Sequence, residues 1–376
     1  MSSKLFNASL LTACVLLATT SPASASGYTF TDLGTLVGRY STARGINNSG
    51  QVVGQYSISG DSDYHAVIWD GTALHTPTDL GTLGRSDSIA VGINNAGQVA
   101  GYSYTDPNSL GDYVAHAVIW DGTALHKPTD LGTPLGGSVS GAWDINDSGQ
   151  VVGMSYTLGD TTQHAIIGGQ GSLASGINNS GQVVGWSSTS GNNVTLHAII
   201  WDGTALHTPT DLGTLGGSHS FATGINDSGQ VVGYSSISGN FFPFHAAIWN
   251  GTTPTDLGTL GGGFSVAFGI NNAGQVVGYS TITIDRPETH ATIWNGTTPT
   301  DLNNFLSVSD VAHWVLETAH GINDSGWIIG SAYSLVSGER HAFLLTPVPE
   351  PETYALFMAG LGLMGFIARR RKNGQA

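Results

Sequence analysis

Short apolar stretches alternate with glycine-rich turns throughout the chain, as residues 222–260 illustrate. Gln230–Ser235 and His245–Trp249 are rich in β-branched and aromatic residues, which predicts two strands. Ala222–Asn226 and Thr253–Leu260 predict two further short strands. Asn226–Gly229, read as N-D-S-G, fits a type I turn whose glycine adopts positive φ, and therefore predicts a hairpin with a glycine bulge. Four short antiparallel strands in ~45 residues match the size of one propeller blade.

This unit recurs along the chain with little change in its turn sequence. Its Ile-Asn pair occurs seven times, with isoleucines at Ile46, Ile93, Ile145, Ile177, Ile225, Ile270 and Ile322. A sequence unit that recurs along the chain in this way is the signature of a repeat architecture. The 3.6-residue period of helical repeats is absent. We therefore expect an all-β fold, a seven-bladed β-propeller of four-stranded antiparallel blades formed by residues 26–347, with an open β-array as the alternative.

The two ends of the array complement each other. Tyr28–Leu36 reads as a fourth strand without the first three, and the seventh copy ends at His341–Leu345 without a fourth strand. We expect these ends to pair and close a ring, which removes open sheet edges. The third copy lacks the tryptophan and the D-L-G-T-L segment, so its blade is expected to have three strands.

The termini predict export and sorting. Lys4, the apolar Leu10–Ala18 and the Ala23-Ser24-Ala25 cleavage site are typical of a secretory signal over residues 1–25, removed by signal peptidase. A lipoprotein box at Leu11–Cys14 is the alternative. Cys14 is the only cysteine, so the mature array contains no disulfide.

The C-terminal segment has three parts: Pro349-Glu350-Pro351, an uncharged, mostly apolar run at Tyr354–Ala368, and the basic cluster Arg369, Arg370, Arg371 and Lys372. The apolar run is shorter than the ~20 residues of a spanning helix, so we expect a short helix that inserts transiently in the membrane as part of a sorting tail at 348–376. This tail resembles the PEP-CTERM sorting signal of Gram-negative bacteria that make exopolysaccharide. The resemblance implies an exosortase partner and release or attachment at the cell surface.

The array itself resembles the HAF-repeat family of bacterial extracellular proteins. Its D-L-G-T-L-G-G and G-I-N-D-S-G-Q-V-V-G segments carry the resemblance, whereas only His341-Ala342-Phe343 has the complete His-Ala-Phe triplet. The resemblance implies no catalytic residue.

Charge limits the choice of partners. The array has six basic and 24 acidic residues, a formal net charge of −18. A surface this acidic is expected to repel nucleic acid and anionic lipid.

Two sets of repeated residues are interpreted as structural. The turn glycines are Gly50, Gly97, Gly149, Gly181, Gly229, Gly274 and Gly326. The histidines that begin each third strand are His65, His116, His164, His197, His245, His290 and His341. Metal binding by the histidines is the alternative, but a sevenfold ring of ligands converges only on its axis. We instead expect contacts with the fourth-strand aspartates Asp32, Asp79, Asp130, Asp211, Asp256 and Asp301, and no metal or cofactor.

Tryptophans at the end of the third strands, such as Trp249, are expected to pack between blades rather than stack on sugars. The Asn-rich turns lack the alternating acidic ligands of a calcium loop. An asymmetric catalytic site should break the repeat. The departures are Arg39, Arg44, Trp143-Asp144, Asp285–Glu288, and a cluster of Asp310, His313 and Glu317 that offers weak catalytic candidates.

These observations favour a non-catalytic cell-surface or matrix protein that associates with extracellular polysaccharide or other surface components. A carbohydrate-active propeller enzyme and a purely structural coat protein are the alternatives.

Overall fold

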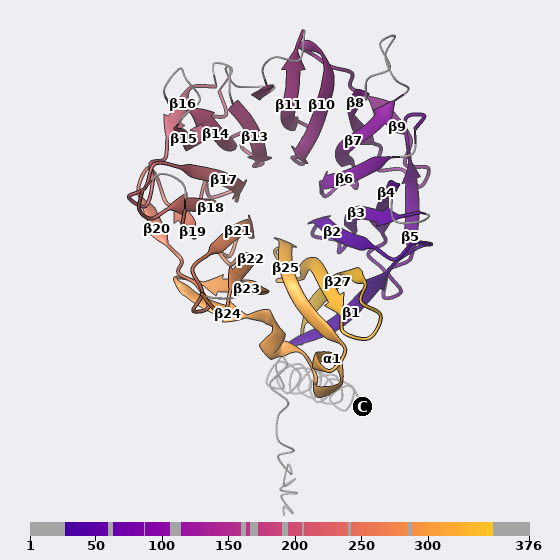
Figure 1. Cartoon of the computed structure of the whole chain (residues 1–376). Coiled ribbons are helices and arrows are strands. Elements are labelled where there is room, and N and C mark those ends of the chain that lie inside the picture. The colour runs from indigo at the N-terminus through magenta and orange to yellow at the C-terminus, as the bar shows by residue number, and fades with distance from the viewer. Residues whose placement is uncertain are drawn as a thin grey trace, which may run out of the picture.

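The computed structural model describes residues 27–58, 63–85, 87–105, 114–158, 163–165, 172–189, 195–204, 207–239, 242–284 and 288–348. Within these residues, 27 strands form seven blades around a central axis (Figure 1). The first three blades contain β2 (Ser41–Ile46), β3 (Val52–Ser57), β4 (Tyr64–Trp69) and β5 (Pro77–Gly81); β6 (Ser88–Ile93), β7 (Val99–Thr105), β8 (Val114–Trp120) and β9 (Pro128–Asp130); and β10 (Gly136–Ile145), β11 (Val151–Thr157) and β12 (Gln163–Ala165).

The next three blades have four strands each: β13 (Ser172–Ile177), β14 (Val183–Ser188), β15 (Leu196–Trp201) and β16 (Pro209–Asp211); β17 (Ser220–Ile225), β18 (Val231–Ser236), β19 (Phe244–Trp249) and β20 (Pro254–Asp256); and β21 (Ser265–Ile270), β22 (Val276–Thr281), β23 (Thr289–Asn295) and β24 (Thr298–Asp301). Two short helices follow, η1 (Leu302–Phe305) and α1 (Val308–Val311). The seventh blade consists of β25 (Trp314–Ile322), β26 (Ile328–Ser334), β27 (Arg340–Pro347) and the N-terminal β1 (Tyr28–Gly34).

The ring closes as predicted. β1 pairs antiparallel with β27 from Tyr28 opposite Pro347 to Gly34 opposite Ala342. Figure 1 shows the indigo β1 beside the yellow β27, so the first strand of the chain completes the last blade. The third blade has three strands among the described residues, as expected from its missing segment. A single parallel bridge, between Val139 and Ala115, joins it to the second blade.

The core is divided among the contacts between neighbouring blades. One cluster combines Ile68 and Leu80 of the first blade with Val99, Val118 and Trp120 of the second. Trp69, Trp120, Trp201, Trp249 and Trp294 are at most 3% exposed. Their burial agrees with packing between blades and leaves no exposed face for a sugar ladder.

Glycine is required at two points of each hairpin. Gly229 has a φ of 80°, which a type I turn ending in a left-handed residue needs. A Cβ on Gly233 would collide with the carbonyl oxygen of Phe221 on the paired strand. The Val-Val-Gly sequence of the second strand therefore lets the inner strand approach closely.

Two details differ from the sequence-based prediction. The fourth strands are shorter, since β20 ends at Asp256, just before Gly258 with its φ of 71°. The predicted glycine bulge is present at the turn, where the N–H of Gly229 donates to the carbonyl oxygen of Asn226 and the N–H of Asn226 donates to that of Gln230. A second bulge, which the sequence did not predict, shifts the register between Ala222 and Gly224, within the inner strand. This shift determines which side chain faces the axis.

Candidate functional site

The first asparagine of each turn joins its blade to the next. Asn226 is 4% exposed, and its Oδ1 accepts the main-chain N–H of Gln230 at 2.9 Å. Its Nδ2 donates to Oε1 of Gln230 at 2.8 Å and to the carbonyl oxygen of Asn271 in the following blade at 3.1 Å. Equivalent bonds to the next blade, 3.0 to 3.1 Å long, are made by Asn47, Asn94, Asn146, Asn178, Asn271 and Asn323, the last returning to Asn47.

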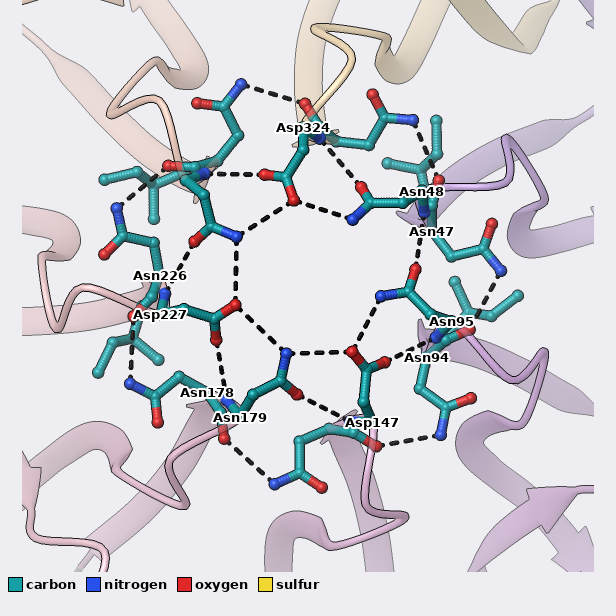
Figure 2. A pocket seen from close by; sticks show the side chains of 18 of the residues that line it. Asn47, Asn48, Asn94, Asn95, Asp147, Asn178, Asn179, Asn226, Asp227 and Asp324 are labelled. Atoms are coloured by element: carbon teal, nitrogen blue, oxygen red, sulfur yellow. Dashed lines mark hydrogen bonds between the residues drawn. The ribbon is translucent and has the colours of Figure 1, made fainter.

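The second residue of each turn forms a ring around the axis, which we call the turn ring (Figure 2). Its members in order are Asn48, Asn95, Asp147, Asn179, Asp227, Asn272 and Asp324. Each carboxylate receives N–H donors from two amide side chains; Asp227, for example, accepts from Asn179 at 3.3 Å and Asn272 at 3.1 Å. The ring surrounds a polar hollow of about 160 Å³. Its aspartates are satisfied by amides, which agrees with a turn role rather than a calcium loop.

A second, larger hollow of about 420 Å³ lies on the axis beyond the isoleucines that follow the bulges. The two hollows share Ile46, Ile93, Ile225, Ile270 and Ile322, and are therefore stacked along the axis. We call the larger one the axial chamber.

The axial chamber is lined by the bulged residue of every inner strand. These residues are Arg44, Val91, Trp143, Ser175, Thr223, Phe268 and His320. A β-bulge re-aims a side chain relative to the regular alternation of a strand. Seven different residue types occupy this position, although the adjacent Ile-Asn pair is invariant.

Asp144 is a further departure within the axial chamber. The other six copies have glycine at this position, where the inner strands approach each other closely; a Cβ on Gly92 would lie 3.0 Å from Cα of Asp144. The Asp144 carboxylate accepts N–H donors from Ile145 at 2.8 Å and from Ile177 of the fourth blade at 2.9 Å. It therefore connects the short third blade to its neighbour. Burial raises the pKa of Asp144 to about 6, although these two bonds favour the charged form.

His320 and Arg44 lie on adjacent blades of the axial chamber. Burial, and then the charge of Arg44, lowers the pKa of His320 to about 3. The His320 ring lies against Phe268, with ring centroids 5.4 Å apart. The guanidinium of Arg44 donates from Nε to Oε1 of Gln55 at 3.3 Å. Among the described residues, no carboxylate lies within ion-pair distance of Arg44.

Compared with the wild type, acidification should lower the melting temperature of Asp144→Asn more steeply and that of His320→Gln less steeply. The raised pKa of Asp144 means that native protein binds a proton there between about pH 4 and 6, so this group stabilises the fold as the pH falls. The lowered pKa of His320 has the opposite effect on stability. Below pH 6.5, the pKa of a histidine in the unfolded chain, the unfolded protein binds a proton that the folded protein does not, so this group destabilises the fold as the pH falls. Melting temperatures from pH 7.5 to 4 should therefore fall more steeply for Asp144→Asn than for the wild type, and less steeply for His320→Gln. Parallel curves for all three proteins would contradict these protonation states; His313→Gln, at an exposed site, is the control.

The predicted contact between histidine and aspartate is present in six blades. The Nδ1-to-carboxylate distances are 2.6 to 3.0 Å for His65–Asp79, His116–Asp130, His197–Asp211, His245–Asp256, His290–Asp301 and His341–Asp32. The hydrogen bond to Asp32 raises the pKa of His341 across the ring closure. His164, in the three-stranded blade, has a buried Nε2 without a partner in the part of the chain described. No group of three or more metal-ligating side chains occurs in the described residues.

The structure does not bring Asp310, His313 and Glu317 together as a catalytic group. Asp310 lies on α1 and accepts the hydroxyl of Ser307 at 2.6 Å. Nδ1 of His313 contacts the carbonyl oxygen of Ser309, and Glu317 binds Arg340 at 2.7 Å. Each side chain therefore has a different hydrogen-bond partner.

Arg44 and Trp143-Asp144 stand out in the sequence as departures from the repeat, but the chamber as a whole does not. The sequence feature that could have revealed the chamber is the residue two positions before each Ile-Asn pair, because this residue is different in every copy. Arg39, the other arginine among the departures, forms an exposed ion pair with Glu339 at 3.6 Å. The cleavage-site residues Ala23 and Ala25, the sorting residues 349–351 and 369–372, and Asp285 lie outside the described residues. No helix in the described part of the chain combines the length and apolar character needed to cross a membrane.

Comparison with known proteins identifies the C-terminal segment. Residues 347–372 match the PEP-CTERM protein-sorting motif. The chain carries an exosortase sorting signal. It is therefore an exported protein that is sorted to the cell surface, with an exosortase as its processing partner.

Comparison with solved structures gives distant similarities over most of the chain. No curated protein matches the sequence. Trypanosoma rangeli sialidase has a TM-score of 0.37 at 11% identity, covering 90% of this chain and 57% of that one. The complex of Trypanosoma rangeli sialidase with 2,3-difluoro-KDN has a TM-score of 0.39 at 11% identity, covering 89% and 56%. This chain thus spans little more than half the length of these proteins, and the likeness bears on neither activity nor ligand.

Proposed function

We propose that this chain is a non-catalytic cell-surface propeller that binds extracellular polysaccharide through its axial chamber. The observation that carries the proposal is the bulged position, where seven nearly equivalent blades present seven different side chains. A purely structural ring has no need of such diversity at its axis. A binding site requires a few polar groups placed at defined points among apolar and aromatic ones.

The chemistry of the lining favours binding over catalysis. Asp144 is the one carboxylate among the residues lining the axial chamber, and two main-chain N–H groups already hold it. The hydroxyls of Ser175 and Thr223 donate to the carbonyl oxygens of Ala222 and Ala267 at 2.6 and 2.8 Å. Glycoside hydrolysis ordinarily uses a pair of carboxyl groups on either side of the bond. The resemblance of the array to HAF-repeat extracellular proteins is consistent with this proposal and forms part of it.

The test combines binding and cleavage in one tube. The full chain, purified in mild detergent, is mixed with exopolysaccharide from the source organism, and both co-sedimentation and new reducing ends are measured. We expect co-sedimentation without new reducing ends. New reducing ends would overturn the non-catalytic proposal in favour of a carbohydrate-active enzyme, and absence of co-sedimentation would favour a structural coat protein.

A further inference from the structure

The axial chamber contains a cation, Arg44, that has no counter-ion among the residues the structure describes. Arg44 is partly buried, and its one hydrogen bond to the described part of the chain, through Nε to Gln55, does not use the terminal nitrogens of the guanidinium. The array has only six basic residues among 24 acidic ones. Two of the others, Arg39 and Arg340, are paired with Glu339 and Glu317. Removing a cation from water is unfavourable unless a partner compensates it, so an unpaired arginine beside the axis indicates an anionic ligand.

The planar shape of the arginine side-chain group indicates which kind of anion the chamber would bind. Its planar group of N–H donors matches the two oxygens of a carboxylate. Asp144 lines the same chamber two blades away and adds a negative charge to an already acidic protein. This carboxylate would repel a ligand of several negative charges more strongly than a ligand with a single carboxylate, so a singly charged anion is favoured.

The remaining lining suits a hydroxylated ring. Trp143 and Phe268 contribute aromatic surface to the axial chamber, and aromatic rings bind the apolar faces of sugars. Trp143 packs against Tyr102 in a T-shaped contact, with ring centroids 5.6 Å apart, and Phe268 packs against Tyr279 with centroids 5.8 Å apart, so both rings are held in place. A carboxylate has about four acceptor sites, and Asp144 uses two on main-chain N–H groups. The two remaining acceptor sites of the Asp144 carboxylate could accept hydrogen bonds from sugar hydroxyls.

We infer that the axial chamber binds a carboxylated sugar unit, with Arg44 holding its carboxylate, Trp143 and Phe268 contacting its ring, and Asp144 accepting its hydroxyls. Its volume of about 420 Å³ lies within the range of small-ligand sites. The inference rests on the proposed function and specifies its ligand: a uronate residue of the polysaccharide, presented at a chain end that enters the axis.

Calorimetric titration tests this inference with the full chain in mild detergent. The ligands are methyl glucuronoside, its neutral counterpart methyl glucoside, and acetate, a carboxylate without a ring. We expect the glucuronoside to bind the wild type about tenfold more tightly than the glucoside. Arg44→Gln should lower the glucuronoside affinity to that of the glucoside, and Arg44→Lys should restore part of the difference because it keeps the charge but not the planar donors. Arg39→Gln, which removes one positive charge from an exposed side chain that does not line the chamber, is the matched control and should bind as the wild type does.

Three results would overturn the inference: no binding of the glucuronoside by the wild type, equal binding by Arg44→Gln with an unchanged melting curve, or equal affinity for acetate. Co-sedimentation with the polysaccharide separates these failures from failure of the proposed function. If the wild type co-sediments with the polysaccharide but does not bind the glucuronoside, the propeller binds polysaccharide at a site other than the axial chamber. If the glucuronoside binds but the polysaccharide does not, the chamber is specific for a free sugar acid and the polysaccharide proposal fails.

Discussion

A chain that lacks residues 27–36 is expected to melt as a whole about 10 °C or more below the intact protein. The deletion removes β1, which supplies the outer strand of the seventh blade and pairs with β27 along six positions. Leu33 is 7% exposed in the intact protein, and Phe30 packs on the same blade near Phe343. Burying side chains of this size contributes roughly 1.5–3 kcal/mol each. The bond from Nε1 of Trp69 to the carbonyl oxygen of Leu33, 3.0 Å long, is lost as well.

Differential scanning calorimetry distinguishes ring closure from a merely local contact. Loss of closure should shift one cooperative transition, because every blade depends on its neighbours. Asp32→Ala is the matched control: it removes the contact with His341 but retains the strand, and its effect should be a small fraction of that of the deletion. An unchanged transition in the deletion variant would contradict the view that β1 holds the ring closed.

Asn226→Ala is expected to destabilise the propeller by about 2–4 kcal/mol, since it leaves the main-chain N–H of Gln230 without its partner and removes the bond to the next blade. The side chain serves both its own turn and the carbonyl oxygen of Asn271 in the next blade. Chemical denaturation measures the change in the free energy of unfolding. Ser228→Ala is the control, because the second and sixth copies already have alanine there, at Ala96 and Ala273. A loss equal to that of Ser228→Ala would mean that the bond between blades contributes little.

The architecture could be predicted from the sequence because its information is local or repeated. The turn residues and strand lengths define one blade, and the incomplete ends at Tyr28–Leu36 and His341–Leu345 complement each other. A histidine recurs at the start of the third strand and an aspartate in the fourth strand, 14 residues apart in three copies and 11 in two, and this recurrence allowed their contact to be predicted. In each case the partners belong to one blade, including the blade that the two ends assemble.

The axial chamber was harder to predict because it depends on contacts between blades and on the bulge. Regular alternation along Ser220–Ile225 assigns alternate side chains to opposite faces of the strand, and the register shift at Thr223 changes that assignment. Likewise, Asn226 reaches Asn271 only because the ring places their turns side by side. The Asp310 cluster shows the opposite situation: its residues are close in sequence, but each side chain hydrogen-bonds a different partner.

The number of residues in the turn ring limits how Asn and Asp can be arranged in it. Two residue types can alternate all the way round a ring only when the ring has an even number of members. Seven members force one pair of like neighbours. Here that pair is Asn48 and Asn95, whose amide groups donate away from each other, to Asp324 and Asp147. Exchanging the fifth copy with the sixth would place two carboxylates side by side. The blades are therefore not interchangeable parts, and the order of Asn and Asp along the chain records the position that each copy must occupy.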